Sequence, residues 1–344
     1  MVMQLLQPSD HTLLLNLGIF LGHPNDVISP VLLQKGFPLK ELSLRIPTPG
    51  YKPGSPDSAA VPDLGYSSTE NNAVLLLEAK GGGTDDNQIE RFQYVQNNPN
   101  TLMVKRNNLD VVSKNLIIDF GLLCSDIDKI KQNHNQTAIP FPVIFYDKKN
   151  KNLRYEKFNT IDFKNNQISS AFSSPLPVPR LPILFIPFGP TEFNENMPYI
   201  VKNLLMLVFE ASQNLKKFER MPTIEELLLI RFPMLRMMGK EEFDQLVKIT
   251  NTVLEKLFPD DSIASRYSLQ KYISHKKGKL YLRKMTLRKF LERLESALID
   301  YENNRRQTKQ VTFAYNFSQQ DVLPIPEINF EKFFGKDAID YDEN

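Results

Sequence analysis

The sequence predicts an α/β protein with a mixed β-sheet core flanked by helices, followed by a β-rich extension and a helical C-terminal region. Three observations support this class. Helical and strand patterns alternate over residues 1–125, apolar runs broken by prolines fill the middle, and apolar residues at helical spacing dominate the last third. With 344 residues, 41% hydrophobic and 24% charged, the chain can bury a sizeable core, which excludes a fully disordered protein.

We expect four regions along the chain. Residues 1–130 form the α/β core, 131–195 the β-rich extension, 196–312 a helical and basic region, and 313–344 an acidic tail. The basic charge is concentrated, because Ala264 to Gln310 holds 13 Lys and Arg against 4 Asp and Glu, a local charge of +9. The whole chain carries only +2, so the rest of it is acidic.

The N-terminal elements follow from local pattern. The apolar run Leu13 to Leu21 fits either a helix or a strand, whereas Asp26 to Gly36 predicts a short helix that ends at the glycine. Leu39 to Ile46 alternates apolar and polar residues, as a half-buried strand does. Val61 to Tyr66 and Ala73 to Leu77 flank a polar turn and predict a hairpin whose second arm is buried on both faces.

The later elements are predicted in the same way. We expect a helix over Gln88 to Gln96 and strands at Leu116 to Leu123, Val143 to Tyr146, Leu153 to Phe158 and Leu181 to Phe188. In the last third, Thr223 and Glu226 have the spacing of a capping box. Two apolar stripes, Phe243 to Leu257 and Leu287 to Tyr301, predict amphipathic helices.

Several classes of protein are excluded by what the sequence lacks. One cysteine, Cys124, supports neither a disulfide framework nor a cysteine-based zinc site, and the apolar runs are too short to cross a membrane. The phosphate loop, the dinucleotide fingerprint, the nucleophile elbow and the zincin motif do not occur. The four histidines are scattered, so we expect surface or core roles for them: His11, His23, His134 and His275.

One group of residues has the side chains that a metal-dependent catalytic site needs. Pro62-Asp63 lies on the first arm of the predicted hairpin, and Glu78-Ala79-Lys80 ends its buried second arm. Carboxylates on adjacent strands can converge on a divalent cation, and a lysine two residues on lies on the same strand face. Such a cation can activate water and neutralise charge on a phosphodiester.

Competing matches have weaker settings. Two other acidic-x-lysine triplets, Asp147-Lys148-Lys149 and Asp162-Phe163-Lys164, lie in polar stretches rather than at the end of a buried strand. A second Pro-Asp pair, Pro56-Asp57, competes for the aspartate role but lies in a proline-rich loop. Ionisable groups at the end of an apolar strand are costly, which favours a site at Glu78 and Lys80.

With these motifs the chain resembles the PD-(D/E)xK nuclease superfamily over residues 10 to 125. A third element adds to the resemblance, because Gln88 and Phe92 have the glutamine and aromatic spacing that the family often shows on the helix after the ExK strand. The resemblance implies a restriction-endonuclease-like fold. It also implies metal binding by Asp63, Glu78 and the backbone carbonyl of Ala79, and catalytic roles for Asp63, Glu78, Lys80 and Gln88. Many members carry a glutamate on the first helix, where this region offers only Asp26, so a second metal stays open.

The basic segment predicts a nucleic-acid surface. Lysines and arginines cluster there with tyrosines between them, and such a patch can neutralise several phosphates. The residues that we expect to bind nucleic acid are Lys276, Lys277, Lys279, Arg283 and Lys284. A solvated helix face is the alternative explanation of the same charge.

These predictions combine into one function. We expect a cytoplasmic, Mg²⁺-dependent endodeoxyribonuclease, with Mn²⁺ able to substitute, that cleaves DNA as a homodimer or larger assembly and has no membrane partner. By analogy with the family, restriction or anti-phage defence is its setting. The alternative is a non-catalytic DNA-binding or assembly subunit that keeps the nuclease fold.

Overall fold

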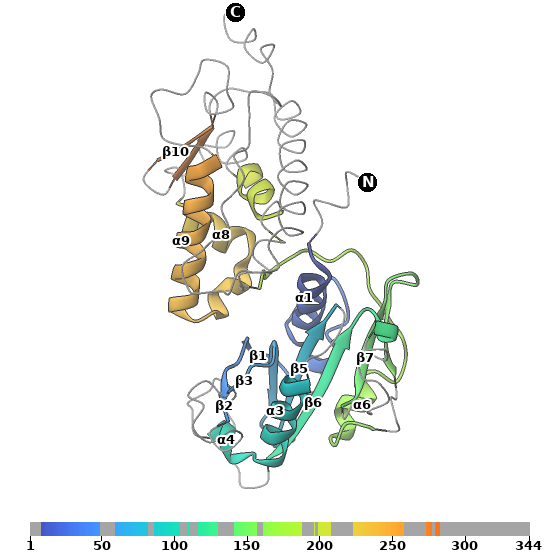
Figure 1. Cartoon of the computed structure of the whole chain (residues 1–344). Coiled ribbons are helices and arrows are strands. Elements are labelled where there is room, and N and C mark those ends of the chain that lie inside the picture. The colour runs from blue at the N-terminus through green and yellow to red at the C-terminus, as the bar shows by residue number, and fades with distance from the viewer. Residues whose placement is uncertain are drawn as a thin grey trace, which may run out of the picture. The chain divides into compact units, whose positions relative to one another are not determined.

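The computed structural model describes most of the N-terminal half of the chain and parts of the rest. The described residues are 8–48, 59–81, 86–103, 109, 116–129, 141–156, 161–187, 196, 199–207, 223–257, 273–276 and 279–282. The chain divides into two compact units, one formed by Asp10–Phe185 and the other by Met1–Ser9 with Ile186–Asn344. Figure 1 shows the elements of both units.

The unit Asp10–Phe185 is a mixed α/β structure built on a seven-stranded sheet in the order β1-β4-β5-β6-β7-β8-β9. The strands β5, β6 and β7 are parallel, and the other neighbours are antiparallel. The strands are β1 (Leu39–Leu42), β4 (Leu64–Ser68), β5 (Ala73–Lys80), β6 (Ile117–Cys124), β7 (Val143–Asp147), β8 (Asn152–Glu156) and β9 (Leu176–Pro177). A separate two-stranded ribbon pairs β2 (Ile46–Pro47) with β3 (Ala59–Ala60).

Helices lie on both faces of the sheet. They are α1 (Asp10–Gly22), α2 (Val31–Gln34), α3 (Asp86–Asn97), α4 (Asn100–Met103) and α6 (Asn166–Ala171). The antiparallel β4–β5 register, with Leu64 opposite Leu77 and Tyr66 opposite Leu75, sets which residues share a face. Leu64 and Tyr66 contact α1, so Val74, Leu76 and Glu78 project to the opposite face, where α3 packs.

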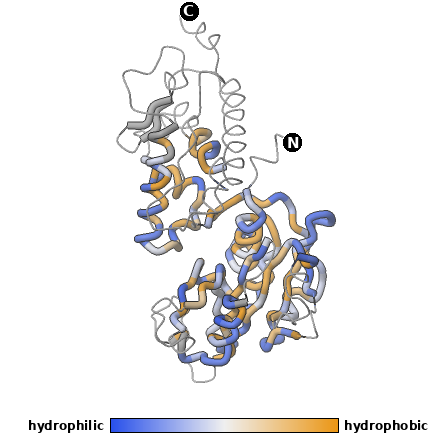
Figure 2. Tube along the Cα trace, viewed as in Figure 1, coloured by the Kyte–Doolittle hydropathy of each residue, from blue (hydrophilic) through white to orange (hydrophobic). Residues whose placement is uncertain are grey.

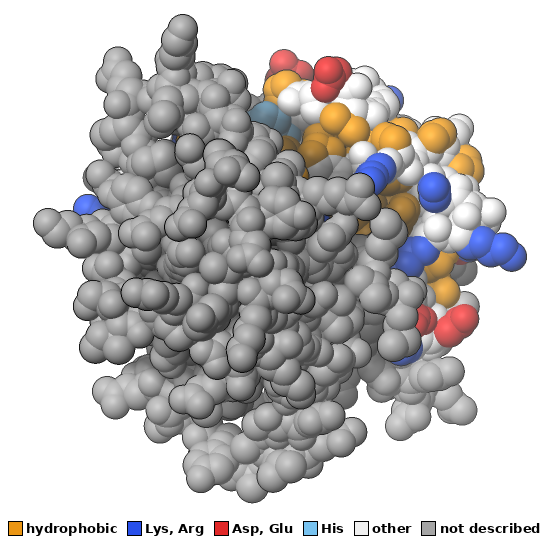
Figure 3. Space-filling view, turned by 90° about the horizontal axis from the view of Figure 1, so that it is seen from above, with side chains coloured by type: hydrophobic (Ala, Val, Ile, Leu, Met, Phe, Trp, Pro, Cys, Tyr) orange, Lys and Arg blue, Asp and Glu red, His pale blue; other side chains and the backbone are white. Residues whose placement is uncertain are grey.

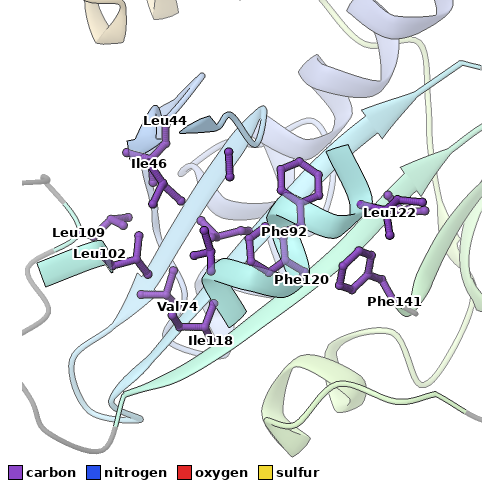
Figure 4. Close-up of a cluster of buried hydrophobic side chains, with 14 of the residues drawn as sticks. Leu44, Ile46, Val74, Phe92, Leu102, Leu109, Ile118, Phe120, Leu122 and Phe141 are labelled. Carbon is purple, nitrogen blue, oxygen red and sulfur yellow. The ribbon is translucent and has the colours of Figure 1, made fainter. Parts of the chain in front are cut away.

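The core under α3 is aromatic and aliphatic. Phe92 of α3 stacks on Phe120 of β6 with ring centroids 4.8 Å apart, and Phe141 packs against Phe120 at 5.7 Å. Figure 4 shows Phe92 among the side chains of β5 and β6. Val74 and Leu76 complete the cluster from β5 and are fully buried. This packing holds α3 on β5, the strand that carries Glu78.

The apolar run Leu13 to Leu21, which fits either a helix or a strand in the sequence, belongs to the helix α1. This helix is buried along most of its length. Figure 2 shows hydrophobic residues along α1 and the central strands. Tyr66 donates from its hydroxyl to the carbonyl of Gly18 at 2.8 Å. A Cβ at Gly22 would lie 2.5 Å from Tyr66 Cε1, so only glycine allows this close approach of helix and strand.

The predicted strand Leu181 to Phe188 is wrong over its described residues, 181–187, which belong to no helix or strand. Asn16 of α1 is the reason. Its Oδ1 accepts from the N–H groups of Leu184 and Phe185 at 2.6 and 2.9 Å, and its Nδ2 donates to the Phe185 carbonyl at 2.7 Å. One buried side chain thus satisfies backbone groups that a neighbouring strand would otherwise pair.

The bounds of other elements also differ between the sequence prediction and the structure. The helix expected over Asp26 to Gly36 is reduced to Val31–Gln34, and Gly36 ends it with a φ of +80°. The hairpin of β4 and β5, the helix α3, the strand β6 and the hairpin of β7 and β8 are confirmed. Because β7, β8 and β9 join the sheet of the core, the expected extension 131–195 contributes strands to that same sheet.

The second unit is helical in most of its described residues. It contains α8 (Ile224–Arg231), the 3₁₀ helix η2 (Pro233–Met237) and α9 (Lys240–Leu257), followed by a hairpin of β10 (Ile273–Lys276) and β11 (Lys279–Leu282). The predicted capping box is confirmed, because Thr223 accepts from the Glu226 N–H and Glu226 accepts from the Thr223 N–H. The stripe Phe243 to Leu257 lies on α9, whereas Leu287 to Tyr301 falls outside the described residues.

Candidate active site

The β4–β5 hairpin brings Asp63 next to the strand that carries Glu78. Asp63 comes directly before β4, and the pair Leu64–Leu77 places it opposite the end of β5. The backbone N–H of Ala79 donates to Asp63 Oδ2 at 2.8 Å. The carbonyl of Asp63 in turn accepts from the N–H of Ser43 at 2.8 Å. Backbone hydrogen bonds therefore fix both the main chain and the carboxylate of Asp63.

Glu78 is the most buried charged group of the site, with 3% of its surface exposed. Its Oε1 lies 2.7 Å from Lys80 Nζ and accepts from Gln88 Nε2 at 2.6 Å. Its Oε2 is buried and has no hydrogen-bond partner among the described residues. A buried carboxylate oxygen without a donor is costly, so it indicates a position where a ligand would be stabilising.

Burial is the main reason that the pKa of Glu78 is raised from 4.5 to about 8. The negative charge of Asp63 raises it further, while Lys80 and Gln88 oppose the rise by stabilising the charged form. Without a further positive charge, Glu78 therefore keeps its proton at neutral pH. A cation placed between the two carboxylates would reverse the balance of charge and ionise Glu78.

The helix α3 positions Gln88 and anchors the ribbon in front of the site. One turn after Gln88, Arg91 Nη1 donates to the carbonyl of Ala59 at 3.1 Å. Ala59 belongs to β3, four residues before Asp63. The helix α3, which Phe92 holds on the sheet, thus contacts Glu78 through Gln88. Through Arg91 it also contacts β3, which precedes Asp63.

The site contains a residue that the sequence reasoning missed. His11, in the first turn of α1, places Nε2 3.3 Å from Asp63 Oδ2. A Cβ at Gly81 would lie 3.0 Å from Asp10 Cβ, so the start of α1 lies against the end of β5. The only signal in the sequence was a histidine two residues before an apolar run, and that run had to be recognised as a helix before His11 could be placed.

Asp26, the acidic residue that the sequence offers for the first helix, lies elsewhere. It is exposed and follows the C-terminal end of α1, whereas the site lies at the N-terminal end. At 1.5 Å per residue, the 13 residues of α1 separate the two ends by about 20 Å. Asp26 therefore does not take the place of the glutamate that many members of the nuclease superfamily carry on the first helix.

The donors of the site are chemically suited to Mg²⁺ or Mn²⁺. Asp63 and Glu78 supply carboxylate oxygens and Ala79 a backbone carbonyl, which are the hard ligands that these ions take in proteins. Among the residues that the structure describes, no group of three or more His, Cys, Asp or Glu side chains is arranged to hold a metal. An ion held here would therefore take two side-chain ligands and complete its shell with the carbonyl and water, as Mg²⁺ commonly does.

The residues predicted to bind nucleic acid are only partly described. Lys276 and Lys279 are cross-strand neighbours at the end of the β10–β11 hairpin, and Lys277, Arg283 and Lys284 lie outside the described residues. Asp57, the competing aspartate, also lies outside them. On the face seen in Figure 3, basic, acidic and hydrophobic side chains alternate over the described surface.

The fold and the site define a mixed α/β domain with an ionisable cluster at the end of a buried central strand. A model of the MJECL32 domain family matches residues 10–186, slightly more than half of the chain, and the chain belongs to this family. The match spans almost the same residues as the unit Asp10–Phe185. Searches of curated proteins and of solved structures each found no match. Within the described part of the chain, none of the helices has the length and apolar character needed to span a membrane.

Proposed function

We propose that this protein is a metal-dependent nuclease that hydrolyses DNA phosphodiester bonds. One observation carries the proposal: the buried Glu78 has Lys80 and Gln88 on one oxygen and no described partner on the other, with Asp63 held beside it. Structural ion pairs are normally satisfied on both oxygens when they are buried. An incomplete one with a raised pKa is typical of a functional site.

The arrangement of elements supports the restriction-endonuclease-like part of the proposal. The residues of the PD and ExK motifs lie on adjacent antiparallel segments, and the helix that follows carries a glutamine in contact with the motif glutamate. The mixed sheet has helices on both faces, as that fold requires.

Each side chain has a distinct part in the proposed reaction. Asp63, Glu78 and the Ala79 carbonyl would hold Mg²⁺ or Mn²⁺, and the bound ion would supply charge neutralisation and a more acidic water. Lys80 would orient or deprotonate the attacking water, or stabilise the charge that builds on the phosphate. As the new oxygen–phosphorus bond forms, one phosphodiester oxygen leaves and takes up a proton. Gln88 would hold Glu78 by its first oxygen, which would leave the second oxygen free to bind the ion.

The basic segment would bind the substrate, with Lys276, Lys277, Lys279, Arg283 and Lys284 neutralising phosphates. The proposed assembly is a homodimer or larger oligomer, and the proposed setting is restriction or anti-phage defence in the cytoplasm. Both parts of the proposal rest on analogy with the nuclease superfamily.

Plasmid cleavage tests the proposal. We expect cleavage with Mg²⁺ or Mn²⁺ and none with EDTA. Asp63→Asn, Glu78→Gln and Lys80→Ala should each reduce the rate at least ~100-fold, because the groups act as a unit. Asp57→Asn and the exposed Glu70→Gln serve as controls and should cleave normally. If purified wild type binds DNA but leaves it intact in every divalent cation, the non-catalytic DNA-binding or assembly subunit becomes the better interpretation.

A further inference from the structure

The turn between β7 and β8 places lysines at the same edge of the sheet as the candidate active site. The parallel registers put Lys80 level with Cys124 and Cys124 level with Phe145, so β5, β6 and β7 end at one edge. The turn Lys148–Lys151 begins directly after β7. It holds three exposed lysines among its four residues: Lys148, Lys149 and Lys151.

Side-chain contacts connect this turn to the carboxylates. Lys148 Nζ lies 2.6 Å from Asp10 Oδ2 in the first turn of α1, and the next residue, His11, contacts Asp63. Two strand spacings of about 4.8 Å separate β5 from β7, a span of about 10 Å. One DNA strand advances about 3.4 Å per nucleotide, so the span corresponds to about three nucleotides.

The turn is held in one conformation by its own hydrogen bonds. Asp147 accepts from the N–H groups of Lys149 and Asn150 at 2.9 and 3.0 Å, and from Asn150 Nδ2 at 2.7 Å. The N–H of Val178 donates to the carbonyl of Lys151 at 2.8 Å. The lysines therefore project from a fixed backbone.

The acidic groups around the turn already have donors. Asp147 is bound within the turn, Asp10 pairs with Lys148, and Asp126 accepts from the N–H of Lys129 at 3.0 Å. By contrast, no acidic side chain of the described part of the chain pairs with Lys149 or Lys151. The pair of Lys148 with Asp10 is half-exposed on both sides, so it can open for another anion at little cost.

We propose that the turn Lys148–Lys151 binds the phosphodiester backbone of DNA a few nucleotides from the cleaved bond. The identity of the ligand rests on the proposed function, while the position of the surface rests on the sheet register. The turn belongs to the unit that contains the carboxylates, so it positions the substrate strand over the site. The basic segment around Lys276 would supply affinity from the other unit.

The test measures the salt dependence of DNA binding by the full-length chain. The variant carries Lys149→Gln together with Lys151→Gln, and the probe is a fluorescein-labelled duplex of about thirty base pairs, in Ca²⁺ to suppress cleavage. The matched control carries Lys35→Gln together with Lys164→Gln. These two lysines lie near the opposite edge of the sheet, where Gly36 adjoins Ser68 and Lys164 donates its N–H to Asp119.

We expect the slope of log K against log salt to fall by about 1.8 in the variant and to stay unchanged in the control, because each lost phosphate contact removes about 0.9. An unchanged slope in the variant overturns the proposal, as does a wild type that shows no affinity for DNA. Cleavage assays in Mg²⁺ separate the two proposals. A reduced slope without any cleavage supports this surface and contradicts the nuclease, whereas cleavage with an unchanged slope does the reverse.

Discussion

Replacing Glu78 with glutamine should remove a pH-dependent cost from the metal-free fold. Burial raises the pKa of Glu78 from 4.5 to about 8, so the folded state keeps a proton that the unfolded state has lost between these pH values. The contribution of Glu78 to the free energy of unfolding is then fully present below pH 4.5 and is lost as the pH rises through 8. Between the ordinary pKa of 4.5 and pH 7 lie 2.5 pH units, and each unit removes about 1.36 kcal/mol from the free energy of unfolding. At pH 7 the cost to folding is therefore about 3 kcal/mol.

The glutamine variant should show a much flatter profile. Its amide oxygen can still accept from Gln88 and Lys80, but the new amide N–H₂ lacks an acceptor at the position of Oε2. This unpaired donor offsets part of the gain, so we expect a net stabilisation of about 1–2 kcal/mol at pH 7. Urea denaturation followed by circular dichroism in EDTA, at several values between pH 5 and pH 8, measures it.

Glu70→Gln is the matched control, because it makes the same chemical change at an exposed position in the turn before β5. Its profile should run parallel to that of the wild type. If the Glu78→Gln profile is also parallel to the wild type, Glu78 is ionised in the metal-free fold, and burial does not raise its pKa.

Three further changes test the site and the packing around it. Asp63→Asn should abolish the rise in Tm that Mn²⁺ gives the wild type, since mass action requires binding to the folded state; an equal rise in both would contradict the site. Asn16→Ala should cost about 2–4 kcal/mol in urea denaturation by leaving the backbone groups of residues 184–185 unpaired, and a loss below about 0.5 kcal/mol would show that water replaces it. Tyr66→Phe should cost about 1–2 kcal/mol by removing the hydrogen bond to Gly18, and an unchanged midpoint would show that this bond contributes nothing net.

The elements that the sequence predicted best are those whose pattern is decided locally. The run Ala73 to Leu77 is continuously apolar because β5 is covered on both faces, and the hairpin follows from the polar turn before it. The capping box at Thr223 requires only three residues and is likewise confirmed. Such signals depend on neighbours in sequence, so tertiary contacts do not override them.

The failures have a common physical origin in long-range contacts. Leu181 to Phe188 has the composition of a strand, but its backbone partners are the side-chain atoms of Asn16, about 170 residues earlier. His11 could not be assigned to the site for the same reason, because its partner Asp63 is 52 residues away. A sequence pattern shows which residues are apolar or charged. It does not show which polar atom, distant in sequence, forms a hydrogen bond with a given residue.

The burial that made β5 recognisable also links stability to ion binding at Glu78. The cost of about 3 kcal/mol at pH 7 arises because an apolar strand ends in a carboxylate without a donor on Oε2. A divalent cation that ionises Glu78 must displace its proton, and at pH 7, one unit below the raised pKa of about 8, this costs about 1.4 kcal/mol, a factor of about ten in Kd. This cost of removing the proton falls to zero above pH 8, where Glu78 is already charged. Mn²⁺ affinity should therefore rise about tenfold per pH unit between pH 6 and pH 8 and then level off, as isothermal titration calorimetry can measure. An affinity that stays constant over this range would show that the ion does not depend on the ionisation of Glu78.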